Sequence, residues 1–537
     1  MDNHCNLPTT DNSTQCATDK NAIRTSFAAV RARAAHESAC KTALEAQRPQ
    51  PSSSCAPASN APASTTDEAG DDATNQANYG KGRMCLFVTL GCAKNQVDTD
   101  RMRALLLASG FREAHNADDA DVVLINTCSF LASATSESID VTLDLAQEQQ
   151  NGITTCPIIM CGCVPARYGK ALDGELPEVA AFVKANDEDG IIGVVCDVLG
   201  LEHPSFSFVE ELTRRALRTK EATSAFVKIS EGCSRMCAFC AIPNIRGPYA
   251  SRPPQDILAE VDMLVDAGIH EIILIGQDTG IWGCDFKEPK TLAWLLQQVA
   301  HHVRGKQCWI RVLYLQPEGM TPELISTIRD TPEVLPYIDI PIQHCSEQVL
   351  KRMGRTGSAQ ELHELFTTLR REIPNMVLRT TGMVGFPGET AQEADELVDF
   401  FKAEEFDYMS VFSYSQEGGT TAARMRDQVS AQTKLERTQR LRDVAEELGF
   451  SATAKHVGEV VDVIIDSKDY NDDGSFELIG HAWFQAPDCD GAVHLPADAG
   501  EIGDIVRVRL VSSYCYELSA TLLGSDDANH AHINTNE

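Results

Sequence analysis

The chain has 537 residues, of which 43% are apolar, enough for roughly two to four domains with buried cores. Its 46 basic and 78 acidic residues give a net charge of −32, which disfavours a nucleic-acid partner because phosphate binding needs a basic face. The longest apolar runs fall far short of the roughly 18 residues of a membrane helix, and the first ten residues lack the features of a secretory signal. These features predict a cytoplasmic protein with no membrane partner.

Cysteine is unusually frequent, with 19 residues in the chain. In a long chain without an export signal, clustered cysteines more often bind metal or perform redox chemistry than form disulfides. The spacing of the cysteines therefore decides which of them matter.

Residues 1–81 are rich in Ala, Ser, Thr, Asn and Pro and lack a sustained apolar period. Such a segment buries too little apolar surface to offset its ordering entropy. We expect a disordered extension, whose four irregularly spaced cysteines are incidental.

Residues 82–205 contain three short β-branched runs, MCLFVTLGC, DVVLINTC and CPIIMCGC, with helical patterns between them. This alternation predicts an α/β domain with a parallel sheet. Each run ends in a cysteine, namely Cys92, Cys128 and Cys163. Because the carboxyl ends of parallel strands share one edge, the three thiols can converge into one ligand set. The alternative is that each is an ordinary small buried residue.

Residues 219–455 form a second α/β series, after a linker helix predicted within 205–222. The expected strands are 224–230, 271–277, 309–316, 337–344, 376–385 and 406–415. Helices are expected between them and at 431–455, which closes the domain. Six β/α units predict a full or partial barrel with its chemistry at the carboxyl ends of the strands.

Residues 456–523 alternate apolar and polar positions around Gly and Asp turns, which predicts a small antiparallel β-barrel followed by a tail, 524–537. From 456 to the end there are 16 acidic and 3 basic residues, a net charge of −13. Such a surface repels a phosphate backbone and suits a basic protein. A generally solvated acidic exterior explains the charge equally well.

The loop after the first strand of the second domain reads EGCSRMCAFCAIP and carries Cys233, Cys237 and Cys240. Structural zinc normally takes four protein ligands, and no fourth cysteine or histidine follows closely. Three thiolates on a 4Fe-4S cluster leave one iron open, and such a cluster can donate one electron. The spacing therefore favours a redox-active cluster with an open iron that can chelate a substrate; bound S-adenosylmethionine could then be cleaved reductively.

This motif resembles that of the radical S-adenosylmethionine superfamily. The wider chain, over 83–523, resembles the methylthiotransferases of that superfamily, which have an N-terminal three-cysteine domain, a radical barrel and a C-terminal TRAM barrel. The resemblance implies a second 4Fe-4S cluster on Cys92, Cys128 and Cys163. Cys161 is a neighbouring candidate for the third ligand, and that choice stays open.

Two subfamilies of methylthiotransferase differ in their substrate. TLGCAKNQVDTDRM at 89–102, YIDIPIQHCS at 337–346 and APDCDGAVHL at 486–495 are similar to the RimO-like, protein-modifying type, although Ala93 stands where proline is usual. That type modifies an aspartate of ribosomal protein S twelve, and the alternative type modifies a tRNA adenosine. A non-catalytic iron–sulfur protein that binds the ribosome is a third reading.

The resemblance also implies the reaction. The barrel cluster cleaves S-adenosylmethionine, the resulting radical takes hydrogen from the aspartate β-carbon, and the second cluster delivers methylated sulfur to give 3-methylthioaspartate. An electron donor such as flavodoxin and a sulfur donor are implied partners, and no residue beyond the cluster ligands is assigned as catalytic.

Residues at the strand ends are weaker candidates. Glycines there allow close approach of a ligand to the backbone. This predicts cofactor contacts at Gly276, Gln277 and Gly385. Arg246 and Arg379 can bind carboxylates, with a structural role as the equal alternative. His344 can face the target, although a satisfied barrel histidine is the commoner outcome.

Overall fold

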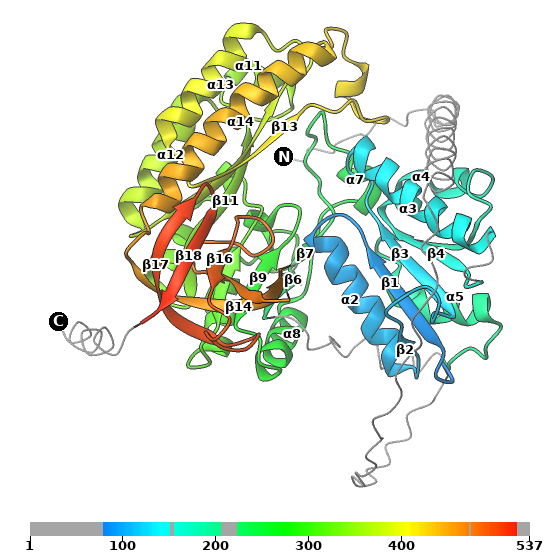
Figure 1. Cartoon of the computed structure of the whole chain (residues 1–537). Helices are drawn as coiled ribbons and strands as arrows, with labels where there is room; N and C mark the ends of the chain where they lie inside the picture. The colour runs from blue at the N-terminus through cyan, green and yellow to red at the C-terminus, as the bar shows by residue number, and fades with distance from the viewer. Residues whose placement is uncertain (1–78, 151–154, 206–222, 472–473, 524–537) are drawn as a thin grey trace, which may run out of the picture. The chain divides into compact units, whose positions relative to one another are not determined.

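The computed structural model describes residues 79–150, 155–205, 223–471 and 474–523 (Figure 1). The chain divides into two compact units. The first is Met1–Leu90, Met102–Ser129 and Ser133–Leu212, and the second is Gly91–Arg101, Phe130–Ala132 and Thr213–Glu537. The predicted extension up to residue 78, the linker helix at 206–222 and the tail 524–537 lie outside the described residues.

The first unit is built on a five-stranded parallel sheet in the order β2-β1-β3-β4-β5. Its strands are β1 (Met84–Thr89), β2 (Arg112–Glu113), β3 (Val122–Thr127), β4 (Ile158–Gly162) and β5 (Val179–Lys184). The helices that alternate with them are α2 (Ala93–Ala108), α3 (Ala132–Gln150), α4 (Cys163–Tyr168) and α5 (Ile191–Leu199), although the part of α2 up to Arg101 and the first residue of α3 belong to the second unit. All residues of β3 and β4 are buried, which explains their unbroken apolar runs.

The strand order of this sheet reverses between β1 and β3. Open α/β sheets bind their ligands in the crevice outside the carboxyl ends of the strands at such a switch point. The predicted parallel α/β fold is confirmed, and the short strands β2 and β5 with helices α4 and α5 extend it beyond the elements expected from the sequence.

The second unit contains a six-stranded parallel sheet in the sequential order β6-β9-β10-β11-β12-β13. Its strands are β6 (Ser224–Lys228), β9 (Glu271–Ile275), β10 (Trp309–Val312), β11 (Val334–Gln343), β12 (Val377–Val384) and β13 (Tyr408–Ser413). Strands β6 and β13 do not pair, so the predicted barrel is a partial one. Each strand falls inside the range expected for it or within three residues of it.

Helices follow the strands of this partial barrel, and α11 to α14 are seen beside β11 and β13 in Figure 1. They are α7 (Ile242–Arg246), α8 (Pro254–Asp266), α9 (Leu292–Val303), α10 (Pro322–Asp330), α11 (Glu347–Arg352), α12 (Ala359–Glu372), α13 (Ala391–Glu404) and α14 (Ala431–Ala454). A short two-stranded sheet, β7 (Ser230–Glu231) with β8 (Ala250–Ser251), flanks the cysteine loop and was not expected. The main core lies between these helices and the sheet.

The C-terminal strands close into a barrel in the order β14-β15-β16-β18-β17. They are β14 (Val460–Tyr470), β15 (Phe476–Ala482), β16 (Val493–Leu495), β17 (Ile505–Tyr514) and β18 (Glu517–Leu522). The expectation of a wholly antiparallel barrel is wrong at one place, because β16 and β18 pair in parallel. Strand β17 runs antiparallel to both β14 and β18, so β18 has the same direction as β14. Strand β16 also has the direction of β14, because β15 runs antiparallel to both of them.

One hydrophobic core joins the inner face of the partial barrel to the C-terminal barrel. Ile273 and Tyr337 of the parallel strands belong to the same buried cluster as Phe484 and Leu518 of the C-terminal barrel. The two barrels of the second unit therefore share their interior.

Within the described ranges, no helix is both long and apolar enough to cross a membrane.

Candidate active site

The cysteine loop, 233–240, begins five residues after β6 and is held by backbone hydrogen bonds at both ends. The Cys233 amide donates to the Gly247 carbonyl at 3.1 Å, and the Ala238 amide donates to the Met353 carbonyl at 2.8 Å. Gly232 precedes the loop with a φ of 69°, and a Cβ at this position would clash with the Pro248 carbonyl. A glycine is therefore required to start this turn.

The three thiols of the loop lie close enough to influence one another electrostatically. Burial, with smaller contributions from neighbouring thiols, raises the pKa of Cys233 and raises that of Cys240 to about 12. The Arg235 and Ile242 amides donate to the Cys233 and Cys240 sulfurs at 3.4 and 3.5 Å, which favours the thiolate. Cys233 and Cys240 are thus neutral on their own and need a bound cation to become thiolates.

Among the described residues, no three His, Cys, Asp or Glu side chains are grouped so that they could hold a metal ion. In a cubane each thiolate binds a different iron, so the thiols of the loop need not converge on one point. The loop fits a cluster better than it fits a single ion.

A ring of paired charges lies beside the cysteine loop. Glu231 receives hydrogen bonds from Lys228 at 2.8 Å and from Gln277 at 2.8 Å, and Arg246 lies 3.3 Å away. Burial alone would raise the pKa of Glu231, but the charges of Lys228 and Arg246 outweigh it and lower the pKa to about 2. Glu231 is therefore a permanent anion and a fixed hydrogen-bond acceptor.

The end of β9 offers polar atoms to a ligand. A Cβ on Gly276 would clash with the Ser230 hydroxyl, so the glycine keeps this strand end close to β7. Gln277 Oε1 and Asp278 Oδ1 are buried, and neither accepts a hydrogen bond from any described residue. Asp278 Oδ2 pairs with Arg235 of the cysteine loop at 2.5 Å. These atoms can accept hydrogen bonds from the amino group and hydroxyls of a bound cofactor.

Gly385, the third predicted cofactor contact, lies in a turn after β12 with a φ of 77°. Its amide donates to Glu389 Oε2 at 2.6 Å, and a Cβ would clash with Lys434. The turn therefore accounts for the glycine at this position without a cofactor contact.

The two candidate arginines and His344 have partners within the protein. Arg246 pairs with Asp98 at 2.9 Å, and both residues belong to the second unit. Arg379 pairs with Asp339 at 3.1 Å and with Asp490 at 3.0 Å. These pairs favour the structural alternative for both arginines.

His344 is fully buried after β11, where its Nδ1 accepts a hydrogen bond from the Ser346 amide at 3.0 Å. Burial lowers the pKa of His344 to about 4, so the ring is neutral. The expectation of a satisfied barrel histidine holds for Nδ1 only, because the buried Nε2 has no hydrogen-bond partner among the described residues.

The cysteines of the first unit lie at the carboxyl edge of its sheet. Thr127 and Gly162 are register partners at the ends of β3 and β4, and Cys128 and Cys163 follow them directly. Cys161, by contrast, lies within β4 and is 1% exposed, and burial raises its pKa strongly. Cys163 is therefore better placed than Cys161 for ligation at this edge. The exposed Cys92 follows β1 after three residues and belongs to the second unit.

Two residues at this end of the barrel were missed by the sequence analysis. Lys94, in the first turn of α2, is 8% exposed, and its Nζ lies 3.1 Å from the centroid of the Tyr314 ring. Tyr314 follows β10 with a φ of 64°, which is costly for a bulky residue. The only sequence signal was a lysine two positions after a strand-end cysteine.

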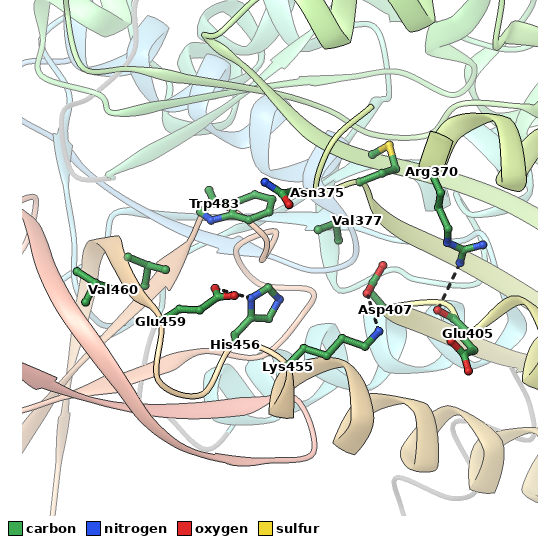
Figure 2. A pocket seen from close by; sticks show the side chains of 12 residues that line it. Arg370, Asn375, Val377, Glu405, Asp407, Lys455, His456, Glu459, Val460 and Trp483 are labelled. Atoms are coloured by element: carbon green, nitrogen blue, oxygen red, sulfur yellow. Dashed lines mark hydrogen bonds and ion pairs between the residues drawn. The ribbon is translucent and has the colours of Figure 1, made fainter. Parts of the chain in front are cut away.

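A pocket of about 700 Å³ lies at the opposite, amino end of β12 and β13 (Figure 2). Two pairs of its charged side chains contact each other: His456 Nδ1 lies 2.9 Å from Glu459 Oε2, and Lys455 Nζ lies 3.9 Å from Asp407 Oδ1. No cysteine lines it. The pocket is therefore separate from the cysteine loop and its chemistry.

Comparison with known proteins identifies three regions. Residues 227–401 match the radical SAM superfamily, 84–184 match Uncharacterized protein family UPF0004 and 457–523 match the TRAM domain. The radical S-adenosylmethionine methyltransferase TsrM from Kitasatospora setae is a structural neighbour with a TM-score of 0.45 and 13% identity, covering 62% of this chain and 72% of that chain. That likeness is too distant to support a functional argument.

Curated relatives match almost from end to end. The ribosomal protein uS12 methylthiotransferase RimO of Pelobacter propionicus is 40% identical over 80% of this chain and 96% of its own length. RimO of Geobacter sulfurreducens is 40% identical over 81% of this chain and 98% of its own length. The chain therefore belongs to the RimO family of radical SAM methylthiotransferases.

Proposed function

We propose that this chain adds a methylthio group to the β-carbon of an aspartate in ribosomal protein uS12, giving 3-methylthioaspartate. The observation that carries the proposal is the 40% identity over 96–98% of relatives that are named for this activity. The matched regions contain both sets of cysteines, which supports an enzyme rather than a non-catalytic ribosome-binding protein.

The residues present fit two 4Fe-4S clusters and S-adenosylmethionine. We propose that one cluster is held by the cysteine loop and the other by the strand-end cysteines; the six ligands are Cys233, Cys237, Cys240, Cys92, Cys128 and Cys163. Three thiolates in each set leave one iron open. When bound, these groups supply the one-electron cleavage of S-adenosylmethionine and the sulfur that is transferred.

In this proposal the chain's own residues bind and orient the cofactor and the substrate, and none of them transfers a proton. Glu231 stays ionised beside Lys228 and Arg246 and can accept hydrogen bonds from the cofactor. Gln277 and Asp278, with Gly276 before them, supply further acceptors at the end of β9. The β-carbon of an aspartate carries no readily removable proton, so radical chemistry needs no general base, and none is assigned.

The partners follow from this chemistry. The reaction needs an electron donor, such as a flavodoxin, and a sulfur donor. A substrate in the small ribosomal subunit supports a cytoplasmic location for the enzyme. The net charge of −13 over 456–537 supports a basic protein target.

The test is anaerobic reconstitution followed by incubation with S-adenosylmethionine, reductant and either uS12 or tRNA. We expect about eight irons per chain and a mass gain of one methylthio group on uS12 alone. A methylthio group on tRNA would favour the tRNA-modifying alternative, and an absence of 5′-deoxyadenosine would exclude a radical enzyme.

A further inference from the structure

Lys94 is a buried cation without an anionic partner. It is 8% exposed, and among the described residues no carboxylate or hydrogen-bond acceptor pairs with its ammonium group, whose recorded contact is the Tyr314 ring at 3.1 Å. An aromatic ring face attracts a cation but does not neutralise it. Burial of an ammonium group is costly unless an anion balances it.

The local backbone increases this need for an anion. Lys94 lies in the first turn of the 16-residue helix α2, which has no acidic residue in that turn. The amino end of a helix carries a partial positive charge, so a lysine there is unfavourable and an anion is favourable. The site is therefore positive from two independent sources.

The nearby carboxylates are already committed to other cations. Glu231 pairs with Lys228 and Arg246, and Asp339 pairs with Arg379 at 3.1 Å. None of them is within ion-pair distance of Lys94. No carboxylate of the described residues balances Lys94, so the carboxylate of a ligand can supply the missing anion.

Tyr314 is held so that its ring meets Lys94. Its carbonyl accepts a hydrogen bond from the Thr279 amide at 3.2 Å, and its amide donates to Asp339 Oδ2 at 3.1 Å. These bonds stabilise a backbone conformation with positive φ that a tyrosine otherwise avoids. The ring lies at the carboxyl end of β10, beside the β9 end that carries Gln277 and Asp278.

We propose that Lys94 binds the side-chain carboxylate of the target aspartate and that Tyr314 positions the Lys94 ammonium for this contact. The inference rests on the proposed function, because an aspartate substrate brings its own carboxylate one bond away from the β-carbon that accepts sulfur. Lys94 is two residues from Cys92, a proposed ligand of the second cluster, and its ammonium lies at the barrel mouth. Binding the carboxylate there holds the β-carbon at the mouth of the partial barrel.

The same contact gives specificity. Lysine donates charge-assisted hydrogen bonds to a carboxylate, and these are about twice as strong as bonds to a neutral amide. Asparagine has nearly the same shape as aspartate and lacks the charge. The enzyme is therefore expected to prefer an aspartate at the target position over an asparagine.

The experiment measures binding and turnover of two forms of uS12, one with the target aspartate and one with asparagine in its place. The enzymes are reconstituted wild type, Lys94→Met, Lys94→Arg, Tyr314→Phe and Tyr314→Ala. Lys290→Met is the matched control, because Lys290 also stacks on an aromatic ring, Trp294 at 3.9 Å, on helix α9. Iron content, S-adenosylmethionine affinity and 5′-deoxyadenosine formation without uS12 are measured in parallel.

We expect wild type and Lys290→Met to bind the aspartate form about tenfold or more tightly than the asparagine form. In Lys94→Met this preference disappears and methylthiolation falls about a hundredfold, while iron content and S-adenosylmethionine affinity are unchanged. Lys94→Arg and Tyr314→Phe, which keep the charge and the ring respectively, retain most of the preference. Tyr314→Ala loses it.

A Lys94→Met enzyme that keeps the preference would overturn the inference while leaving the proposed function intact. So would a loss of S-adenosylmethionine affinity, which would assign the lysine to the cofactor's carboxylate, or a loss of iron, which would assign it to the cluster. If the wild-type enzyme forms 5′-deoxyadenosine but adds no mass to uS12, the proposed function and the inference both fail.

Discussion

The two ends of the partial barrel differ in whether a buried charge is left without an ion-pair partner. At the amino end, Glu271 of β9 and Arg311 of β10 are fully buried and pair at 2.6 Å, and His481 of the C-terminal barrel pairs with Glu271 at 2.5 Å. At the carboxyl end, the Lys94 ammonium has no anion, and buried Gln277 Oε1 accepts no hydrogen bond from a described residue.

The difference separates stability from ligand binding. A buried charge with protein partners is satisfied before any ligand arrives, so it holds the two barrels of the second unit together. A buried polar group without a protein partner has lost its hydration, and this costs free energy that a bound ligand can offset. The carboxyl end, where Lys94 has no ion-pair partner, is therefore the functional end. We expect variants at the amino end to lose stability and variants at the carboxyl end to lose activity.

The largest expected effect is at the cysteines. Cys237→Ala removes one of three loop thiolates and should abolish 5′-deoxyadenosine formation, whereas Cys128→Ala should keep that product and lose sulfur transfer. Product analysis by mass spectrometry and iron counting on both variants check this. If both variants lose cleavage while the loop cluster stays intact in Cys128→Ala, the proposed division of labour between the clusters is wrong.

A smaller effect is expected at the amino end. Glu271→Gln removes the anion between Arg311 and His481 and leaves a buried cation, which should lower the free energy of unfolding by about 3–5 kcal/mol. Chemical denaturation measures the loss, and 5′-deoxyadenosine formation at low temperature should be near normal. A variant of full stability would contradict the assigned role of this pair.

The smallest effect is a difference in pH dependence between two buried histidines. Burial alone would lower the pKa of His481, but Glu271 and Asp466 raise it to about 9. Its contribution to stability is therefore complete below about pH 6.5 and is lost as the pH rises through 9. Burial lowers the pKa of His344 to about 4, so its contribution is complete above about pH 6.5 and is lost as the pH falls towards 4.

Denaturation curves of wild type, His481→Gln and His344→Gln between pH 4 and 9.5 separate the two contributions. The alkaline fall should be missing in His481→Gln and the acid fall should be reduced in His344→Gln. Equal pH profiles for all three proteins would contradict the contrast between a paired and an unpaired end.

The sequence was sufficient to predict where the helices and strands lie along the chain. The expected strands and helices of 224–455 agree with the observed ones to within a few residues, because apolar periodicity is a property of neighbouring residues. The spacing of Cys233, Cys237 and Cys240 was equally local, since one loop carries all three. The parallel β16–β18 pair was not predictable, because pairing direction depends on where the chain returns.

The roles of the charged residues were decided by the tertiary structure. Arg379 was a candidate for binding a carboxylate, and its partners Asp339 and Asp490 lie 40 and 111 residues away in sequence. Lys94 lies 220 residues from Tyr314 in sequence, and a lysine in a predicted helix gives no sign of this contact. The sequence by itself determined the elements and the thiol triplet, because both depend on short-range spacing. Strand register and the packing of the C-terminal barrel decide which charged side chains have an ion-pair partner and which do not. Both exist only in the folded chain.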